Sequence, residues 1–366
     1  MRVVVTGGAG FIGSHLTEEL LRRGASVVVV DDFSSGNHDN LNGLKGALEV
    51  ASHSITDPGA LSRSLRGSDF VLHLAARTSV PKSVADPVES NRVNIDGTLN
   101  VLVAARDARV RRVVLAASSS VYGETSTLPK SVADPVESNR INIDGTLNVL
   151  VAARDARVRR VVFAASSSAY GETSTLPKSE AMRPDPISPY GVTKFAGELY
   201  AQVFARCYGL ETVSLRYFNI FGPRQDPGSP YSGVLSLFIT ALLEGRQPLV
   251  YGDGDQSRDF TFVANAVDAT IRAMEAPGVS GLVFNAGTGS RVTLNQTLAL
   301  LAKISGKPAV AKYDPPRPGD IRDSQADVSL ARQMLGYVPS VDFEEGLRRT
   351  WAWYHARHAA ARMAHS

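Results

Sequence analysis

The sequence predicts an α/β protein in which a doubly wound parallel sheet is joined to a smaller C-terminal substrate domain. Short β-branched runs alternate with helix-length amphipathic segments, which is the pattern of repeated βαβ units. The runs are continuously apolar, as expected of strands covered by helices on both faces. A glycine-rich turn follows the first run, and one 48-residue block occurs twice, so that one helix–strand block is an addition to the fold.

The expected strands of the sheet lie in the first half of the chain. They are residues 3–5, 27–30, 70–72, 113–116 and 161–164. After about residue 216 the sequence becomes rich in glycine and proline, so we expect a first domain over residues 1–216 and a second over 217–366. Residues 260–290 read as a helix and a strand that return to the first domain.

The duplicated block covers residues 82–129 and 130–177, and the two copies differ at only three positions. These pairs are Val93 and Ile141, Leu115 and Phe163, and Val121 and Ala169. The tripeptide Pro-Lys-Ser begins at positions 81, 129 and 177, as expected for a tandem duplication. A stacked repeat protein would instead show three or more divergent units.

Each copy carries a predicted helix, over residues 87–108 or 135–156, followed by a strand and a run of serines. We expect the fold to have room for one copy and the other to be displaced. Both elements could come from the first copy, both from the second, or the helix from the first and the strand from the second. The three differing side chains do not decide, since each methylene is worth only ~0.8 kcal/mol when buried. The displaced copy would keep an apolar stripe that must be covered, so we expect a folded oligomer.

The composition excludes several classes of protein. The net charge is only +3 and the basic residues are spread along the chain, which gives no electrostatic case for nucleic acid. Cys207 is the only cysteine, so the chain has no internal disulfide framework. No apolar stretch approaches the ~20 residues of a membrane helix. We therefore expect a cytoplasmic protein with neither a membrane partner nor a metal site.

The glycine motif is Gly7-Gly8-Ala9-Gly10-Phe11-Ile12-Gly13, between the first strand and a helix. Glycines allow a tight turn and close approach to a pyrophosphate, which the amides and dipole of the helix N-terminus attract. Asp31 ends the second strand, where a carboxylate can accept bonds from the adenosine ribose. Because this acid would repel a 2′-phosphate, the sequence predicts a Rossmann-type domain that binds NAD rather than NADP. Asp32 could share the role or face water.

Tyr190 and Lys194 are four residues apart at the start of a predicted helix, so they share one face. The ammonium can lower the pKa of the phenol and hold the cofactor ribose, which leaves a tyrosinate able to take a proton from a sugar hydroxyl. A serine at the end of a buried strand can bond to the same oxygen. The two copies offer Ser118 and Ser166 for this role.

These residues resemble the extended short-chain dehydrogenase/reductase superfamily, and within it the UDP-glucose (UDP-galactose) 4-epimerase type. The resemblance covers nearly the whole chain. It also includes Leu74-Ala75-Ala76, Arg216-Tyr217-Phe218-Asn219, Tyr251-Gly252-Asp253-Gly254, Arg258-Asp259-Phe260 and Arg317-Pro318-Gly319-Asp320. The family's spacing from serine to tyrosine favours Ser166, which is 24 residues before Tyr190, although Val121-Tyr122-Gly123 is more typical of the family than Ala169-Tyr170-Gly171.

The resemblance implies a cofactor site and a substrate site. The cofactor residues would be Gly7, Gly10, Phe11, Ile12, Gly13, Asp31, Asp32, Ser35, Gly36, Ile55, Leu74, Ala75, Ala76, Tyr190, Lys194 and Tyr217. In the substrate site, Asn219, Arg258 and Arg317 would hold the UDP diphosphate and neighbouring groups. Tyr251 would pack on uracil and Asp320 would bond to a ribose. Ser324 would stand where a bulky tyrosine restricts the sugar pocket in related enzymes.

The implied reaction inverts C4 of a UDP-hexose through a transient 4-keto sugar, in a homodimer. Related dehydratases carry acidic residues after the catalytic serine or threonine, whereas this chain has Ser119-Ser120 or Ser167-Ser168 there, which disfavours dehydration. UDP-glucose and UDP-galactose, with their N-acetyl forms, are the first expectation, and UDP-glucuronate is the next. An NAD-binding protein inactivated by the duplication is the alternative from another class.

Overall fold

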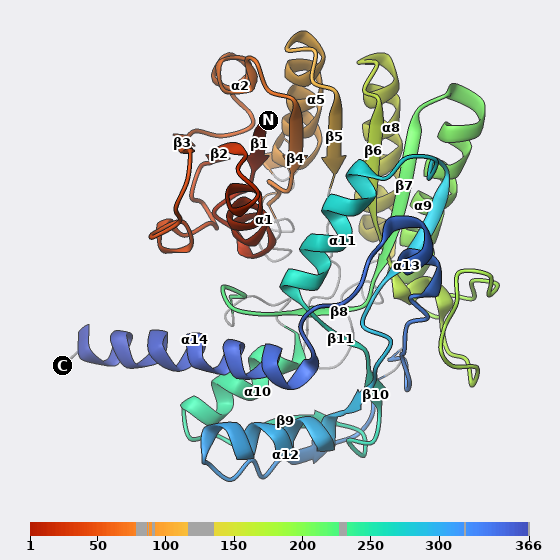
Figure 1. The fold of residues 1–366 in the computed structure, drawn as a ribbon. Coiled ribbons are helices and arrows are strands. Elements are labelled where there is room, and N and C mark those ends of the chain that lie inside the picture. The colour runs from red at the N-terminus through yellow and green to blue at the C-terminus, as the bar shows by residue number, and fades with distance from the viewer. Residues whose placement is uncertain are drawn as a thin grey trace.

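The centre of the fold is an eight-stranded, wholly parallel sheet with strand order β12-β7-β6-β5-β4-β1-β2-β3 (Figure 1). The computed structural model describes residues 1–77, 86, 88–89, 92–115, 135–226, 233–317 and 320–364. The sheet strands are β1 Arg2–Thr6, β2 Ser26–Asp31, β3 Leu48–Ser52, β4 Phe70–His73, β5 Arg112–Leu115, β6 Arg160–Ser166, β7 Glu211–Tyr217 and β12 Leu282–Ala286. The predicted α/β class and parallel sheet are confirmed.

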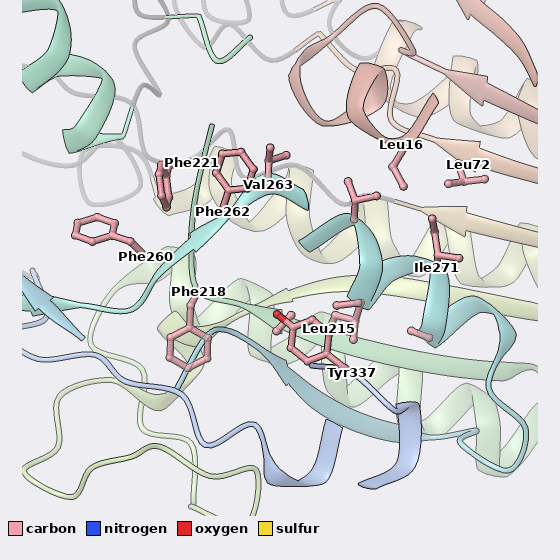
Figure 2. Packing of buried hydrophobic residues seen from close by; sticks show 14 of the residues in the cluster. Leu16, Leu72, Leu215, Phe218, Phe221, Phe260, Phe262, Val263, Ile271 and Tyr337 are labelled. Atoms are coloured by element: carbon pink, nitrogen blue, oxygen red, sulfur yellow. The ribbon is translucent and has the colours of Figure 1, made fainter. Parts of the chain in front are cut away.

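Helices cover both faces of the sheet, because successive strand residues point to opposite sides. Val3 and Val5 face one core with helices α1 and α11, whereas Val4 faces a second core with α2, α5, α8 and α9. The helices are α1 Phe11–Arg22, α2 Pro58–Leu65, α5 Thr98–Asp107, α8 Gly145–Asp155, α9 Pro189–Tyr208 and α11 Val263–Glu275. Figure 2 shows Leu16 of α1 and Ile271 of α11 in the first core.

Both copies of the duplicated block belong to the sheet. The first supplies β5, which pairs with β4 and β6, and the second supplies β6, which pairs with β5 and β7. Equivalent residues lie side by side, with Val113 beside Val161 and Leu115 beside Phe163. One helix–strand block is an addition, as the sequence predicts. The expectation that one copy is displaced was wrong, and so were the three arrangements considered for it.

Both copies can join the sheet because each is a complete helix–strand unit. Each copy supplies a strand together with a helix that covers the sheet, as a parallel sheet requires. Helix α5 packs on α2 and helix α8 packs on α9, while α5 and α8 contact each other. A Cβ added to Gly97 of the first copy would lie 2.7 Å from Ile55, whereas a Cβ added to the equivalent Gly145 would point into open space. In a chain with one copy, a single helix would contact both α2 and α9. Here α5 contacts α2 and α8 contacts α9.

The helix predicted in each copy is present and contains a π-helical segment. In the second copy, α7 Pro135–Asn139, the π-helical residues Arg140–Asp144 and α8 form one helical run. In the first copy, the π-helical residues Arg92–Gly97 lead directly into α5. Nearly identical sequences thus fold alike despite different neighbours.

Within the described residues, the smaller lobe contains three two-stranded sheets and three helices. The strand pairs are β8 Asn219–Phe221 with β11 Phe260–Phe262, β9 Leu249–Tyr251 with β14 Lys312–Asp314, and β10 Ser257–Arg258 with β13 Val292–Thr293. The helices are α10 Val234–Leu243, α12 Leu294–Ser305 and α14 Phe343–Ala364, whereas α13 Ser329–Leu335 packs on β12 and α11 of the large sheet. Phe221 of β8 lies together with Phe260 and Phe262 of β11 (Figure 2).

The chain passes between the lobes more than once. Helix α11 packs against β6 and β7, and β12 pairs with β7, so this part of the C-terminal half lies with the large sheet. The division near residue 216 stays a prediction. Within the described ranges, no helix has both the length and the apolar character needed to cross a bilayer.

Pairing of identical strands places like charges together at the start of β5 and β6. Arg160 is buried, and its guanidinium donates to Glu211 and to three carbonyls at the end of α11. Its counterpart Arg112 has its pKa lowered by burial and by the charges of Arg160 and Arg159. Like charges on adjacent strands are destabilising.

We therefore expect Arg112→Gln to raise the free energy of unfolding by ~0.2 to 1 kcal/mol at low salt, with a smaller gain at high salt. Denaturant titration measures this difference. Arg106→Gln is the matched control, because Arg106 is exposed and pairs with Asp107 on α5. A loss of stability in the Arg112 variant would contradict the repulsion.

Candidate active site

The glycine motif forms an open cradle between β1 and α1. Gly7 has φ of +69°, and a Cβ added to it would lie 2.6 Å from the backbone nitrogen of Ala75. A Cβ on Gly13 would clash with the carbonyl oxygen of Gly7. Gly10 precedes α1 and makes no side-chain cap, which leaves the amides of the first turn without a bond from the N-cap residue. This arrangement fits a pyrophosphate at a helix N-terminus.

Asp31 lies beside this cradle and is hydrogen-bonded to its backbone. Its carboxylate accepts from the backbone nitrogens of Ala9 and Phe33, each at 2.9 Å. Burial raises the pKa of the carboxyl, while these two amide bonds oppose the rise. A Cβ on Gly36 would lie 2.7 Å from Asp31 Oδ1, so a glycine is needed beside it. Asp32 is exposed and accepts from Ser34, so Asp31 is the acid that contacts the glycine turn.

Most of the other residues predicted to bind the cofactor follow the carboxyl ends of neighbouring strands, which meet at one edge of a parallel sheet. Ser35 is exposed after β2, Ile55 is buried after β3, and Leu74-Ala75-Ala76 is half-buried after β4. Phe11 and Ile12 open α1 and are half-buried. Tyr217 lies apart from them at the end of β7.

Tyr217 contacts helix α11 rather than the cradle. Its hydroxyl shares a hydrogen bond of 2.6 Å with the hydroxyl of Thr270. Burial raises the pKa of Tyr217 to about 12, so the phenol is neutral at pH 7.

His73, which the sequence analysis did not single out, joins the cradle to the first copy. Its Nδ1 lies 2.6 Å from the hydroxyl of Thr6 on β1, and its Nε2 lies 2.9 Å from the hydroxyl of Thr98 on α5. Burial lowers the pKa of His73 to about 4, so the ring is neutral at pH 7. Each ring nitrogen therefore has one hydroxyl partner.

Tyr190 and Lys194 lie at the start of α9, as predicted. Ser188 caps the helix by accepting from the backbone nitrogen of Gly191, at 3.2 Å. Both side chains are buried, and Lys194 Nζ is 5.9 Å from the centre of the Tyr190 ring. Lys194 donates to the carbonyl of Ala164 on β6 at 2.7 Å, and burial lowers its pKa to about 7.

The serine run of the second copy lies beside this helix. Ser166 ends β6, and its hydroxyl donates to the hydroxyl of Ser168 at 3.0 Å. A Cβ on Gly191, next to Tyr190, would lie 2.7 Å from the carbonyl oxygen of Ser168. Ser118, the candidate from the first copy, lies outside the described residues.

The second copy also contacts the C-terminal half of the chain. The Tyr170 hydroxyl donates to Asn285 on β12 of the large sheet at 2.7 Å, and Glu172 accepts from the backbone nitrogen of Arg322 at 2.7 Å. Lys178 pairs by its backbone with residues 325 and 327. The chain after β6 therefore contacts the segment that carries the predicted substrate residues.

The predicted substrate residues form two pairs in that lobe. Arg258 donates to Asp320 at 2.8 Å, and the guanidinium of Arg317 lies 3.5 Å from the centre of the Tyr251 ring. Asn219 is exposed at the start of β8, beside Asp259, with which it forms a backbone bond.

Two further residues shape this region. Ser324 is buried and bonds through its backbone to Ser257. The buried Asp259 accepts from the backbone nitrogens of Thr288, Gly289 and Ala326, and this network was not predicted. Among the described residues, no cluster of His, Cys, Asp or Glu could hold a metal ion.

A sequence model described as "NAD dependent epimerase/dehydratase family" matches residues 3–132 and 125–287, and each match contains one copy of the block. The chain belongs to this family. UDP-glucose 4-epimerase from Mycolicibacterium smegmatis is 35% identical, and the alignment covers 96% of this chain and 97% of the relative. The sequence-based assignment is therefore confirmed.

Solved structures agree with this assignment. UDP-glucose 4-epimerase from Thermotoga maritima, solved with UDP-glucose, is 35% identical with a TM-score of 0.73 and coverage of 98% and 99% of the two chains. The Thermus thermophilus UDP-glucose 4-epimerase complex with NAD is 32% identical, with a TM-score of 0.68 and coverage of 97% and 99%. The predicted fold class and the NAD cofactor are confirmed.

The low pKa of His73 makes stability depend on pH. Its ordinary pKa is 6.5, so between about pH 6.5 and 4 the unfolded chain binds a proton that the folded chain does not. The free energy of unfolding therefore falls as the pH falls through this window, by up to ~1.4 kcal/mol per pH unit. We expect His73→Gln to flatten this dependence in denaturant titrations from pH 7 to 4. The exposed His355→Gln is the control, and an unchanged slope in the His73 variant would contradict the assignment.

Proposed function

We propose that this chain is an NAD-dependent 4-epimerase of UDP-hexoses. The observation that carries the proposal is the buried Tyr190–Lys194 pair beside Ser166, at the same sheet edge as the glycine cradle. A phenol, an ammonium and a hydroxyl next to a dinucleotide site suit proton removal from a sugar hydroxyl coupled to hydride transfer.

NAD, when bound, supplies a hydride acceptor for C4 of the sugar. Tyr190 removes the proton of the 4-hydroxyl and later returns it to the 4-keto oxygen. The Lys194 ammonium stabilises the tyrosinate, and the Ser166 hydroxyl donates a hydrogen bond to the same sugar oxygen. C4 would be inverted when the keto sugar turns over in the site and receives on its other face the hydride that bound cofactor would supply.

The predicted substrate residues would make the enzyme specific for sugars that carry UDP. Arg258, Arg317 and Asn219 would hold the diphosphate, for which forked guanidinium donors are well suited. Tyr251 would stack on the uracil, and Asp320 would exchange its partner Arg258 for a ribose hydroxyl. Since Ser324 is small, UDP-glucose and UDP-galactose and their N-acetyl forms are the proposed substrates, with UDP-glucuronate next.

A second candidate is a protein that binds NAD without turnover. The observation that favours it is the extra strand β5, which lies between β4 and the strand that carries Ser166. The proposed location is the cytoplasm, since the single exposed Cys207 suits a reducing compartment.

The test is proton NMR of UDP-galactose, UDP-N-acetylgalactosamine and UDP-galacturonate, each incubated with the protein and NAD. We expect the 4-epimer to form slowly from at least one of them, because β5 lies between β4 and the strand that carries Ser166. Tyr190→Phe should lower kcat by at least ~100-fold, because the general base is lost, while the UDP-sugar Kd changes little. Tyr208→Phe is the matched control, since this exposed tyrosine lies on the same helix. Equal turnover in the two variants would sink the assignment of Tyr190.

We also propose a homodimer formed through the helical layer of α5, α8 and α9. Five exposed apolar side chains support it, two on α5 and three on α9, because exposed apolar surface favours association. They are Leu99, Val103, Val192, Leu199 and Val203.

The double variant Leu199→Glu with Val203→Glu is expected to be a monomer by light scattering, because two charges would be buried in the interface. Val310→Glu, at an exposed valine of the other lobe, should remain a dimer. A double variant that keeps the mass of the dimer would rule out this interface.

A further inference from the structure

The candidate site has two halves that are attached to different strands. One half is the glycine cradle after β1, and the other is the group Tyr190, Lys194 and Ser166 on α9 and β6. One row of paired residues crosses the sheet from Thr6 on β1 to His73 on β4, then to Leu115 on β5 and Phe163 on β6. Thr6 directly precedes the glycine cradle, and Phe163 lies three residues before Ser166. Parallel strands are ~4.8 Å apart, so three spacings separate the halves by ~14 Å.

The cradle is joined to β4 and to the first copy. Thr6 and Thr98 share His73, and the backbone nitrogen of Ala75 reaches the Thr6 hydroxyl at 3.4 Å. Ile55 lies against Gly97 at the start of α5. These contacts tie the cofactor end of the site to β1, β4 and α5.

Tyr190 and Lys194 are joined to the second copy. Lys194 donates to Ala164 of β6, and a Cβ on Gly197 would lie 2.6 Å from the Phe163 ring, so α9 sits directly on this strand. Asn142 of the second copy donates to Thr193 at 3.0 Å. Helix α9 therefore keeps its place on β6, wherever β6 lies in the sheet.

A chain with one copy would need only one strand between β4 and β7. That strand would pair with both, so the same row would cross two spacings, or ~10 Å. The duplication adds its strand between β4 and β6, so the added strand lies between the cradle and the pair Tyr190 and Lys194.

We infer that the duplicated block holds Tyr190, Lys194 and Ser166 one strand spacing too far from the cradle, so that the full chain binds NAD through its ADP half and seldom brings the nicotinamide half to Tyr190 and Lys194. This inference rests on the proposed function. The covalent length of a dinucleotide is fixed, and its reacting atoms must approach within ~3.5 Å of their partners. A misplacement of 1 Å can cost ~100-fold in rate, and one strand spacing is several times larger.

The test compares the affinities of NAD and ADP by calorimetry, because ADP lacks both the nicotinamide and the ribose that Lys194 would hold. The full chain should bind both with Kd values within ~3-fold of each other, and Lys194→Ala should leave them unchanged. A chain lacking residues 82–129 should bind NAD at least ~10-fold more tightly than ADP, since bonds to a charged group are regained, and Lys194→Ala should abolish this preference. Deletion of 130–177 should give the same preference for NAD, because it leaves nearly the same sequence.

Turnover is measured alongside binding. The single-copy chain should epimerise the UDP-sugar at least ~100-fold faster than the full chain. A full chain that prefers NAD by 10-fold and loses this preference in Lys194→Ala overturns the inference, and this result needs no deletion variant to fold. If the binding pattern is as expected and neither chain epimerises any sugar, the proposed function fails while the inference stands.

Discussion

The whole arrangement depends on the in-register pairing of β5 with β6. In a strand the side chains alternate between faces, so a shift of one residue would turn every apolar side chain to the wrong core. Pairing Val113 with Val161 avoids such a shift, because each residue lies beside its own copy. The eight-stranded width, the neighbouring positions of α5 and α8, and the separation of the cradle from α9 all follow from this register.

Strong local patterns made much of the fold predictable. The apolar runs at 3–5, 27–30, 70–72 and 161–164 lie inside β1, β2, β4 and β6, since buried parallel strands have few polar residues. Strand β3 gave no such signal, because it is an edge strand with Glu49 and Val50 exposed. The prediction that one copy is displaced from the sheet was wrong, because it assumed a fixed number of strands. A parallel sheet instead grows by whole helix–strand units.

The candidate site likewise has a part that the sequence predicts and a part that it does not. The glycine motif, Asp31 and the Tyr190–Lys194 pair are recognisable because their chemistry depends on short spacings within one segment. The link from Thr6 through His73 to Thr98 joins residues that are 67 and 25 positions apart, so it depends on strand order. The hydrogen bonds to Asp259 come from two loops that are distant in the sequence, so no local sequence pattern predicts them.

The unequal surroundings of the two copies change how each can evolve. Thr98 holds His73, whereas the equivalent Thr146 follows a strand that has Leu115 where β4 has His73. Gly97 is confined by Ile55, whereas Gly145 has open space. Different positions are therefore constrained in each copy, although the two sequences are almost the same. The sides on which α5 and α8 meet are newly adjacent, and divergence between the copies should begin there.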